Sequence, residues 1–404
     1  MSEPETSAAT RHAAVVLTVS PTGLAVARSL APRGVKVWGV DSNRLEIGHF
    51  SRWFIRDPRI AYEAAGPKLL AGLLALGREQ PAKPVLIIAG DPYIDFVAEH
   101  HEALREHFIL AESMRPEVNS VFVNKRTFYE RCLELGVTLP RTAFPKNEAE
   151  AEAASRELRY PAIVKPTLVH QVRRRLGGQK LVEVDNAADL VRWWKQIREW
   201  GSDAVLQEVI PGPEANLAVA AVYTDAQLEV RSLFTARKNR QYPPNFGSGS
   251  YMEAWWSDEI AKLSCDLVQA LGYQGICGTE YKWDERDRQW KLIELNPRPT
   301  LWYALTRAAG VDVVWDAYCD LVGRPNAIHR NCQDDGVRWQ LLVRDVVSGW
   351  HFWRRGELST REFLRTVVDP RRKEYAVLSL RDPGVLWGYP RNTLWKIQAH
   401  RHKD

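Results

Sequence analysis

Two carboxylates and an amide, spaced along two neighbouring strands, give the clearest chemical signal in this chain. They lie in the segments Gly278–Asp284 and Trp290–Pro299, which read as two apolar strands joined by a short charged turn. Alternation of side chains along a strand places Glu294 and Asn296 on one face, and Glu280 on the partner strand can converge with them. Oxygen ligands of this kind suit Mg²⁺, so we expect these three residues to hold magnesium and, through it, nucleotide phosphates.

Arg298 follows Asn296 by two residues on the same face and is placed to neutralise phosphate oxygens. The alternative is an exposed strand whose acidic side chains are merely solvated. The run Ile-Glu-Leu-Asn-Pro-Arg at 293–298 speaks against that alternative. An acid and an amide embedded among apolar and rigid residues would be costly to bury without a partner.

The first hundred residues predict the parallel sheet that opens a doubly wound α/β fold. The strand Ala13–Val19, a helix ending at Leu30 and the strand Val35–Val40 form a βαβ unit. The turn contains only Gly23, which falls short of a dinucleotide fingerprint and favours a structural βαβ unit over an NAD site. Asp91 follows the next strand at its carboxyl end, so it either contacts a substrate or caps the helix expected over 94–104.

From residue 123 onward the chain alternates helices, strands and one basic loop. The loop 173–180 is rich in arginine and contains two glycines, so it is either a mobile phosphate clamp or a solvated surface loop. The expected elements around it are the helices 124–135, 149–158 and 187–200 and the strands 161–166, 181–184 and 204–210.

Four of these segments, in this order, resemble the signature of the ATP-grasp superfamily. They are Asn124-Lys125 with Gly136-Val137 and Pro140-Arg141-Thr142, then Tyr160–Pro166, then Val205–Gly212, and last Glu280 with Glu294–Arg298. The resemblance implies an ATP-grasp fold of the α/β class. It implies an N-terminal Rossmann-like domain over 1–118, an ATP-grasp domain of two α+β nucleotide-clamping subdomains over 119–330, and a small C-terminal extension over 331–404.

The resemblance also implies a role for each candidate site residue, with ATP and Mg²⁺ as cofactors. Lys125 and Lys165 would bind the α- and β-phosphates, and Lys180 would lie in the loop that closes over the triphosphate. The strand with Gln207 and Glu208 would receive adenine, with Glu208 holding the adenine edge, and Glu214 would contact the ribose. The remaining assignments are the backbone of Val209 for the adenine edge and Glu280, Glu294 and Asn296 for magnesium.

Within the superfamily, the chain is most similar to D-aspartate-ligase-like carboxylate–amine ligases. The helix Gly23–Leu30, the segment Phe234–Gly249 and parts of the C-terminal region carry this likeness. It implies that Arg237 and Lys238 reach phosphate or the activated carboxylate, with Arg240 as a helper and Arg298 as a further catalytic group. The implied reaction forms an amide or peptide bond through an acylphosphate and releases ADP and phosphate.

Two alternatives stay open at this point. One is an ATP-grasp phosphotransferase or carboxylase, and the other is a nucleotide-binding module without turnover. The full metal-binding set favours an enzyme over the second alternative. A phosphate-binding P-loop of the G-x-x-x-x-G-K-[ST] type does not occur in the sequence.

Composition restricts the partners. The net charge of +5 is spread over 404 residues, which gives no indication of nucleic-acid binding. Five cysteines without a CxxC pair, an acidic N-terminus and short apolar runs predict a cytoplasmic protein without a membrane partner. The expected partners are a small-molecule carboxylate and an amine, with amino acids as the expected class. A homodimer is compatible with this assignment because dimers are common among such enzymes.

Overall fold

The computed structural model describes residues 11–167, 172, 174–324, 327–368 and 372–401. Residues 1–10, which include the acidic N-terminus, and Arg173 of the predicted phosphate loop lie outside this part of the chain. The chain forms two compact units, each assembled from separate segments. Unit 1 comprises Met1–Asn119, Leu217–Thr279 and Leu295–Asp404, and unit 2 comprises Ser120–Asn216 and Glu280–Glu294.

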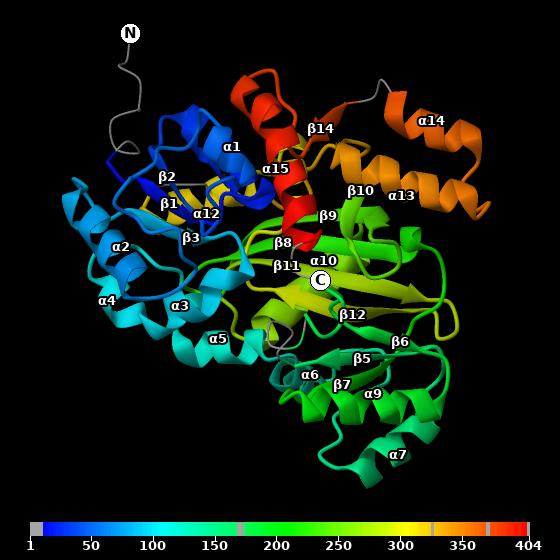
Figure 1. Ribbon diagram of the computed structural model, residues 1–404. Coiled ribbons are helices and arrows are strands. Elements are labelled where there is room, and N and C mark those ends of the chain that lie inside the picture. The colour runs from blue at the N-terminus through cyan, green and yellow to red at the C-terminus, as the bar shows by residue number, and fades with distance from the viewer. Residues whose placement is uncertain (1–10, 168–171, 173, 325–326, 369–371, 402–404) are drawn as a thin grey trace. The chain divides into compact units, whose positions relative to one another are not determined.

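Figure 1 labels the helices and strands in chain order. Unit 1 contains β1 (Ala14–Leu17), α1 (Pro21–Leu30), β2 (Val37–Val40), α2 (Pro67–Glu79), β3 (Val85–Ile88), α3 (Ile94–Glu99), α4 (His101–Arg105), β8 (Leu217–Thr224), β9 (Val230–Tyr242), β10 (Ser248–Ala254), α10 (Asp258–Ala270), α11 (Ala304–Ala308), α12 (Val313–Leu321), β13 (Arg338–Gln340), α13 (Leu342–Arg354), α14 (Thr360–Val368), β14 (Lys373–Tyr375) and α15 (Pro383–Arg401). Unit 2 contains α6 (Lys125–Glu134), β4 (Thr142–Ala143), α7 (Glu148–Glu157), β5 (Ala162–Pro166), β6 (Val182–Val184), α9 (Ala187–Glu199) and β7 (Ala204–Glu208). Segments of both units contribute to α5 (Pro116–Val123), β11 (Gly275–Asp284) and β12 (Gln289–Asn296).

The N-terminal sheet of unit 1 is parallel, with the order β2-β1-β3. Ala14 pairs with Val37 on one side and with Val85 on the other, so the carboxyl ends of the strands meet at one edge. At that edge Thr18 has a positive φ of 86°, and a Cβ on Gly90 would lie only 2.4 Å from its Oγ1. Glycine at position 90 therefore lets β3 end close to β1. The predicted Rossmann-like opening is confirmed.

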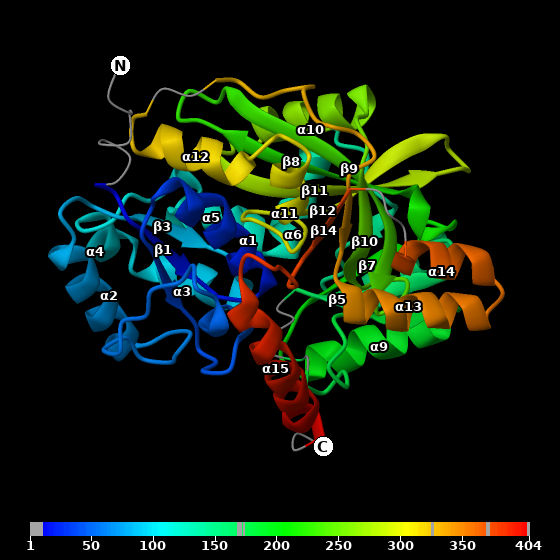
Figure 2. The same ribbon diagram turned by 90° about the horizontal axis from the view of Figure 1, so that it is seen from above.

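A second, seven-stranded sheet has the order β12-β11-β8-β9-β10-β13-β14. Helix α10 packs on β8 and β9, and α13 lies beside α14 (Figure 2). β13 pairs antiparallel with β10, and β14 adds parallel to β13. The C-terminal segment therefore completes this sheet instead of forming a separate body. The division into domains at residues 118 and 330 stays a prediction.

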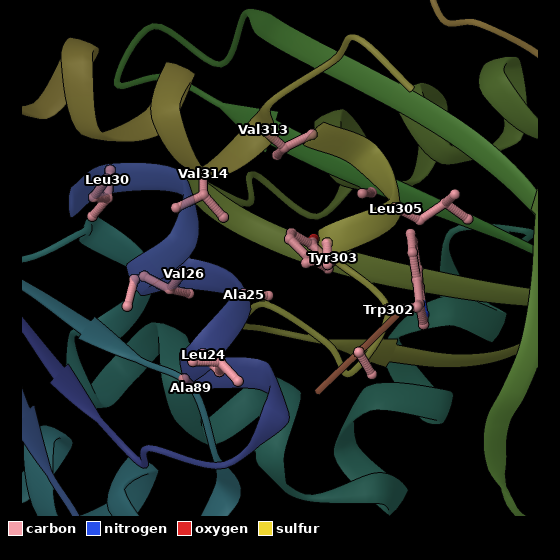
Figure 3. Packing of buried hydrophobic residues seen from close by; sticks show 14 of the residues in the cluster. Leu24, Ala25, Val26, Leu30, Ala89, Trp302, Tyr303, Leu305, Val313 and Val314 are labelled. Carbon is pink, nitrogen blue, oxygen red and sulfur yellow. The ribbon is translucent and has the colours of Figure 1, made fainter. Parts of the chain in front are cut away.

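The hydrophobic core of unit 1 joins the N-terminal helix α1 to the segments that follow β12. Figure 3 shows Leu24, Val26 and Leu30 of α1 gathered with Tyr303 and Val314. All five side chains are almost fully buried. Burying one such side chain contributes about 1.5–3 kcal/mol to folding. This core fixes the chain that follows Arg298.

Unit 2 is a four-stranded sheet with the order β4-β7-β5-β6. Helix α9 packs on β5 and β7, and α7 packs on α9 (Figure 1). Asparagine side chains cap three helices here: Asn124, Asn147 and Asn186 accept hydrogen bonds from the first turns of α6, α7 and α9. The caps and the apolar periodicity explain why these boundaries could be predicted closely.

One predicted element was wrong. The helix expected over 94–104 is divided into α3 and α4 at His100, whose φ and ψ are −104° and 19°.

Among the described residues, the helices are too short or too polar to cross a membrane.

Candidate active site

Lys165 at the end of β5 lies in a buried polar cluster within unit 2. Its Nζ donates to Gln207 Oε1 at 2.7 Å and to the Tyr129 hydroxyl at 3.3 Å. Lys165 is 8% exposed and Gln207 is 1% exposed. Gln207 is itself held by a hydrogen bond to Thr142 Oγ1. A lysine ammonium has three donors, so this arrangement fixes the charge and leaves one donor for an anion.

Lys125 and Glu294 approach each other although 169 residues separate them. The Lys125 Nζ lies 3.5 Å from Glu294 Oε1, and the two side chains are 31% and 44% exposed. Helix α6 presents Lys125 at its first position, and the Tyr129 hydroxyl donates to the Ile293 carbonyl oxygen at 2.7 Å. Tyr129 therefore connects Lys165 to β12 at Ile293, whereas Lys125 contacts β12 directly through Glu294, the residue expected to bind metal.

The predicted magnesium ligands lie on two adjacent strands. Glu294 and Asn296 are both on β12, two residues apart, and Glu280 lies on the neighbouring strand β11. All three are partly exposed. Among the described residues, no group of three or more His, Cys, Asp and Glu side chains could hold a metal alone. The donor set of two carboxylates and an amide fits an ion that also takes phosphate oxygens as ligands.

Glu208 at the end of β7 is buried and surrounded by positive charge. Its Oε1 accepts from the Arg141 backbone N–H at 3.1 Å and lies 3.3 Å from Arg286 and 3.6 Å from Lys291. The neighbouring Val209 N–H donates to the Pro161 carbonyl oxygen at 3.0 Å. Of the backbone groups of Val209, the carbonyl is therefore the one to consider for adenine. Glu208 is placed to orient the strand end.

The β11–β12 turn completes this ionic network. Hydrogen bonds from Arg286 and Lys291 hold the pKa of the Asp284 carboxyl well below its usual range, against the opposing effect of burial. Burial alone would lower the pKa of Lys291, but hydrogen bonds to Asp287 and Asp284 raise it above its usual value. Asp284 and Lys291 are therefore charged near neutral pH, and Arg286 and Lys291 tie the turn to Glu208 at the end of β7.

Two further predicted nucleotide contacts lie in loops of unit 2. Glu214 begins the 3₁₀ helix η5 (Glu214–Asn216), is 9% exposed, and follows Gly212, whose φ is +104°. Lys180 is exposed, beyond Gly177 and Gly178, which both have positive φ. Among the described residues, no hydrogen bond or ion pair joins Lys180 to another predicted site residue. Its role in closing over the triphosphate stays a prediction.

In unit 1, Arg298 forms an ion pair that the sequence did not reveal. Its Nε and Nη2 lie 2.6 and 2.5 Å from the same oxygen of Asp91, and its Nη1 donates to the Pro299 carbonyl oxygen. Helix α3 begins without a side-chain cap. Of the two roles considered for Asp91, helix capping is therefore absent, and the carboxylate instead meets the predicted catalytic arginine.

β9 sends its predicted catalytic side chains to opposite faces of the sheet. Lys238 is 4% exposed, whereas Arg237 is exposed and lies over the Trp255 ring at 4.0 Å. Strand alternation means that the two cannot act from the same face. Arg240 shares the face of Lys238, but it forms a buried bidentate ion pair with Asp345, at 2.8 and 2.6 Å. Arg240 is thus occupied by its ion pair with Asp345 of α13. Lys238 is the better candidate for contacting the reacting groups of the substrates.

Two buried cysteines and one serine–histidine pair were considered as nucleophilic sites among the residues that the structure describes. Burial raises the pKa of the Cys132 thiol to about 12 and also raises that of Cys277. Ser232 donates to Asp316, and His329 bonds to the same carboxylate at 2.8 Å. Serine and histidine thus both bind the acid instead of each other, which is not the order of a catalytic triad.

The seven-stranded sheet, the four-stranded sheet of unit 2 and the lysine–carboxylate arrangement define the ATP-grasp class of fold, and solved structures confirm it. N5-carboxyaminoimidazole synthetase from Staphylococcus aureus, complexed with ADP, superposes with a TM-score of 0.60 at 15% identity, covering 79% of each chain. The biotin carboxylase domain of the Hydrogenobacter thermophilus 2-oxoglutarate carboxylase gives a TM-score of 0.61 at 15% identity, covering 80% of this chain and 72% of the other. These likenesses establish the fold alone.

Sequence comparisons identify more specific relatives. The family model of the carbamoyl-phosphate synthase L chain, ATP binding domain, matches residues 252–318, which include Glu280, Glu294, Asn296 and Arg298. A D-aspartate ligase of Enterococcus faecium is 26% identical over 249 residues, which are 57% of this chain and 58% of the relative. A D-alanine–D-alanine ligase of Pseudomonas entomophila is 30% identical over 191 residues, which are 44% and 57%. The predicted similarity to ATP-grasp ligases of the D-aspartate-ligase type is confirmed, and the matches span less than two thirds of these relatives.

Proposed function

We propose that the protein is an ATP-dependent ligase that joins a carboxylate to an amine through an acylphosphate. The observation that carries this proposal is that two lysines of unit 2 are linked to neighbouring positions of β12: Lys125 pairs with Glu294, and Lys165 bonds to Tyr129, which bonds to Ile293. Two ammonium groups beside a metal-type carboxylate suit a polyphosphate with its magnesium ion. The ligase names of both sequence relatives support the reaction class.

The nucleotide is assigned to unit 2. Lys125 and Lys165 bind the α- and β-phosphates, Glu214 contacts the ribose, and the Val209 carbonyl accepts from the adenine amino group. Glu208 positions this strand end through Arg141, Arg286 and Lys291. Lys180 approaches the triphosphate from its loop.

Glu280, Glu294 and Asn296 would hold magnesium, which would polarise the γ-phosphate and offset the charge that develops on it. The 3.5 Å contact between Lys125 and Glu294 supports this assignment, because each group has an opposite charge as its present partner. When a phosphate binds Lys125, a divalent ion would offset the negative charge of Glu294.

The reaction then proceeds in two balanced steps. A carboxylate oxygen of the substrate attacks the γ-phosphorus, the bond to the β-phosphate oxygen breaks, and ADP leaves. The neutral amine, having lost a proton to water, attacks the acyl carbon. The carbon–oxygen bond to the phosphoryl group breaks, phosphate leaves, and the nitrogen gives up its second proton to water. Lys238 and Arg298 hold the negative oxygens during both steps. Amino acids are the proposed class of both substrates.

A product assay tests this proposal. The purified chain is incubated with Mg-ATP and defined pools of amino acids and small carboxylates, and ADP, AMP, phosphate and amide products are quantified. We expect ADP and phosphate in amounts equal to the amide, with both a carboxylate and an amine required. AMP with pyrophosphate would contradict the acylphosphate route. A phosphorylated product or a carboxylated product without an amide would identify a different reaction on the same fold.

A further inference from the structure

The pair formed by Asp91 and Arg298 shows a marked asymmetry in exposure. Asp91 is the first residue of the 3₁₀ helix η3 (Asp91–Tyr93), at the carboxyl end of β3, where ligands of open parallel sheets bind. Its side chain is 72% exposed, whereas that of Arg298 is 13% exposed. The Asp91 carboxylate is therefore accessible to solvent, whereas the Arg298 guanidinium is mostly buried. An arriving ligand meets a carboxylate first, and the matching group is a cation.

The pair also conflicts with the role proposed for Arg298. Both Arg298 donors that point to Asp91 converge on one oxygen, at 2.6 and 2.5 Å. A carboxylate this close offsets the guanidinium charge and would repel a phosphoryl group approaching the same arginine. Arg298 can stabilise the acylphosphate fully only when another cation takes its place on Asp91.

We infer that Asp91 binds the ammonium group of the amine substrate and thereby releases Arg298 for the acylphosphate. This inference rests on the ligase function proposed above. The exchange replaces one cation by another on Asp91, and no covalent bond changes. Arg298 keeps its bond from Nη1 to the Pro299 carbonyl oxygen, at 3.0 Å, as a pivot. Its Nε and Nη2 then become available for phosphoryl oxygens.

The coupling has a functional consequence. Without an amine, Arg298 is neutralised by Asp91, and the first step of the reaction lacks part of its charge stabilisation. ATP is then spared when no acceptor is present. Asp91 thus determines the specificity for the amine. It also slows phosphoryl transfer when no amine is bound.

Replacement of Asp91 by asparagine separates these effects, with Asp95→Asn as the matched control. Asp95 is an exposed acid four residues further on, in the first turn of α3. In Asp91→Asn we expect the KM of the amine to rise roughly 10- to 100-fold, the usual loss for a charged hydrogen bond. ADP release without an amine should rise above that of wild type, because Arg298 is no longer held by a charge. Asp95→Asn should match wild type in both.

In Asp91→Asn, activity at low amine concentration should fall while ADP release without an amine rises, and these opposite changes distinguish the proposal from a structural role. If both activities fall together in Asp91→Asn, Asp91 merely positions Arg298, and the inference is overturned. Unchanged values would overturn it as well. Thermal unfolding of each variant shows whether the fold is intact. Hydroxylamine serves as an uncharged nucleophile that traps the acylphosphate, and its use should not require Asp91.

A binding measurement keeps the inference separate from the proposed reaction. D-alaninamide carries an ammonium group where D-lactamide carries a hydroxyl, and both are titrated into the full chain by ligand-observed NMR. We expect saturable binding of D-alaninamide alone, lost in Asp91→Asn and retained in Asp95→Asn. If wild type forms no amide but shows this pattern, the reaction assignment fails and the ammonium site stands. If D-alaninamide does not bind wild type, or binds Asp91→Asn equally well, the ammonium site fails.

Discussion

At the scale of single residues, the phosphate site is a balance of charges that a nucleotide would rearrange. Glu294 faces the Lys125 ammonium at 3.5 Å and is 44% exposed, so solvent screens much of their attraction. We therefore expect Glu294 to act in catalysis, through the cation it would hold, and to contribute little to the stability of the ligand-free fold.

Glu294→Gln should lower ADP formation by at least about 100-fold, since a charge that acts on the developing phosphoryl charge is lost. The melting temperature should change little. Glu285→Gln removes an exposed acid from the nearby turn and is the control, for which we expect wild-type turnover. Wild-type ADP formation by Glu294→Gln would show that the metal assignment is incorrect.

His49 offers a test of stability against pH. It is 6% exposed, and among the described residues both of its ring nitrogens lack a hydrogen-bond partner. Burial, assisted by the nearby charge of Arg56, lowers the pKa of His49 to about 4 from 6.5. The unfolded chain binds a proton below pH 6.5 and the folded chain does not, so stability should fall between pH 6.5 and 4, by up to about 3 kcal/mol.

Denaturant titrations at pH 7.5 and pH 5 measure this change in the free energy of unfolding. The difference between the two pH values should shrink in His49→Gln and stay unchanged in His351→Gln, whose histidine is exposed. An equal difference in wild type and His49→Gln would contradict the assignment.

At the scale of elements, helix α13 of the C-terminal segment is bonded through Asp345 to β9, the strand that carries Lys238. Asp345 accepts from Arg240 at 2.8 and 2.6 Å, from Ser250 at 3.1 Å and from Gln340 at 2.6 Å. Asp345 is 1% exposed and Arg240 is 6% exposed. The C-terminal segment therefore fixes β9 and β10 in unit 1, and with them the position of Lys238.

Asp345→Ala leaves the Arg240 charge buried without its partner, so unit 1 should lose about 3–5 kcal/mol of stability. The double variant Arg240→Met with Asp345→Leu should recover most of that loss, because apolar residues can replace a buried ion pair. Chemical unfolding monitored by tryptophan fluorescence gives both values. A loss under about 1 kcal/mol for Asp345→Ala would show that the pair contributes little.

Sequence patterns predicted the elements better than the contacts between them. The alternation in 290–296 and the asparagine caps are local signals, and the structure has β12, α6, α7 and α9 at nearly the expected residues. The pair of Asp91 and Arg298 spans 207 positions, and no local pattern encodes it.

The alternation of side chains in β9 was visible in the sequence, but the resemblance of the segment 234–249 to related ligases was given more weight. Arg237 and Lys238 are adjacent in a strand, and alternation alone separates their faces. Arg240 could not be assigned to a structural pair without knowing that α13 lies on β9. The hydrogen bond from the Val209 N–H to Pro161 could not be predicted either, because it depends on how β7 pairs with β5.

At the scale of the whole molecule, the nucleotide should protect unit 2 selectively. A ligand at 100 times its Kd stabilises the folded state by about 2.7 kcal/mol. Hydrogen exchange with and without Mg-ADP should therefore slow in β5, β7 and β12, whereas the parallel sheet β2-β1-β3 should change less. Removing magnesium with EDTA should weaken the effect. Equal protection of both regions would contradict the assignment of the nucleotide to unit 2.

The central claim is that the carboxylate itself attacks the γ-phosphate, and an oxygen label tests it most directly. The carboxylate substrate found in the product assay is labelled with ¹⁸O in both oxygens and converted with ATP and the amine, and the released phosphate is analysed by mass spectrometry. The acylphosphate route predicts one ¹⁸O in each phosphate, because the carbon–oxygen bond breaks when the amine attacks. Unlabelled phosphate, or label recovered in AMP, would contradict the account.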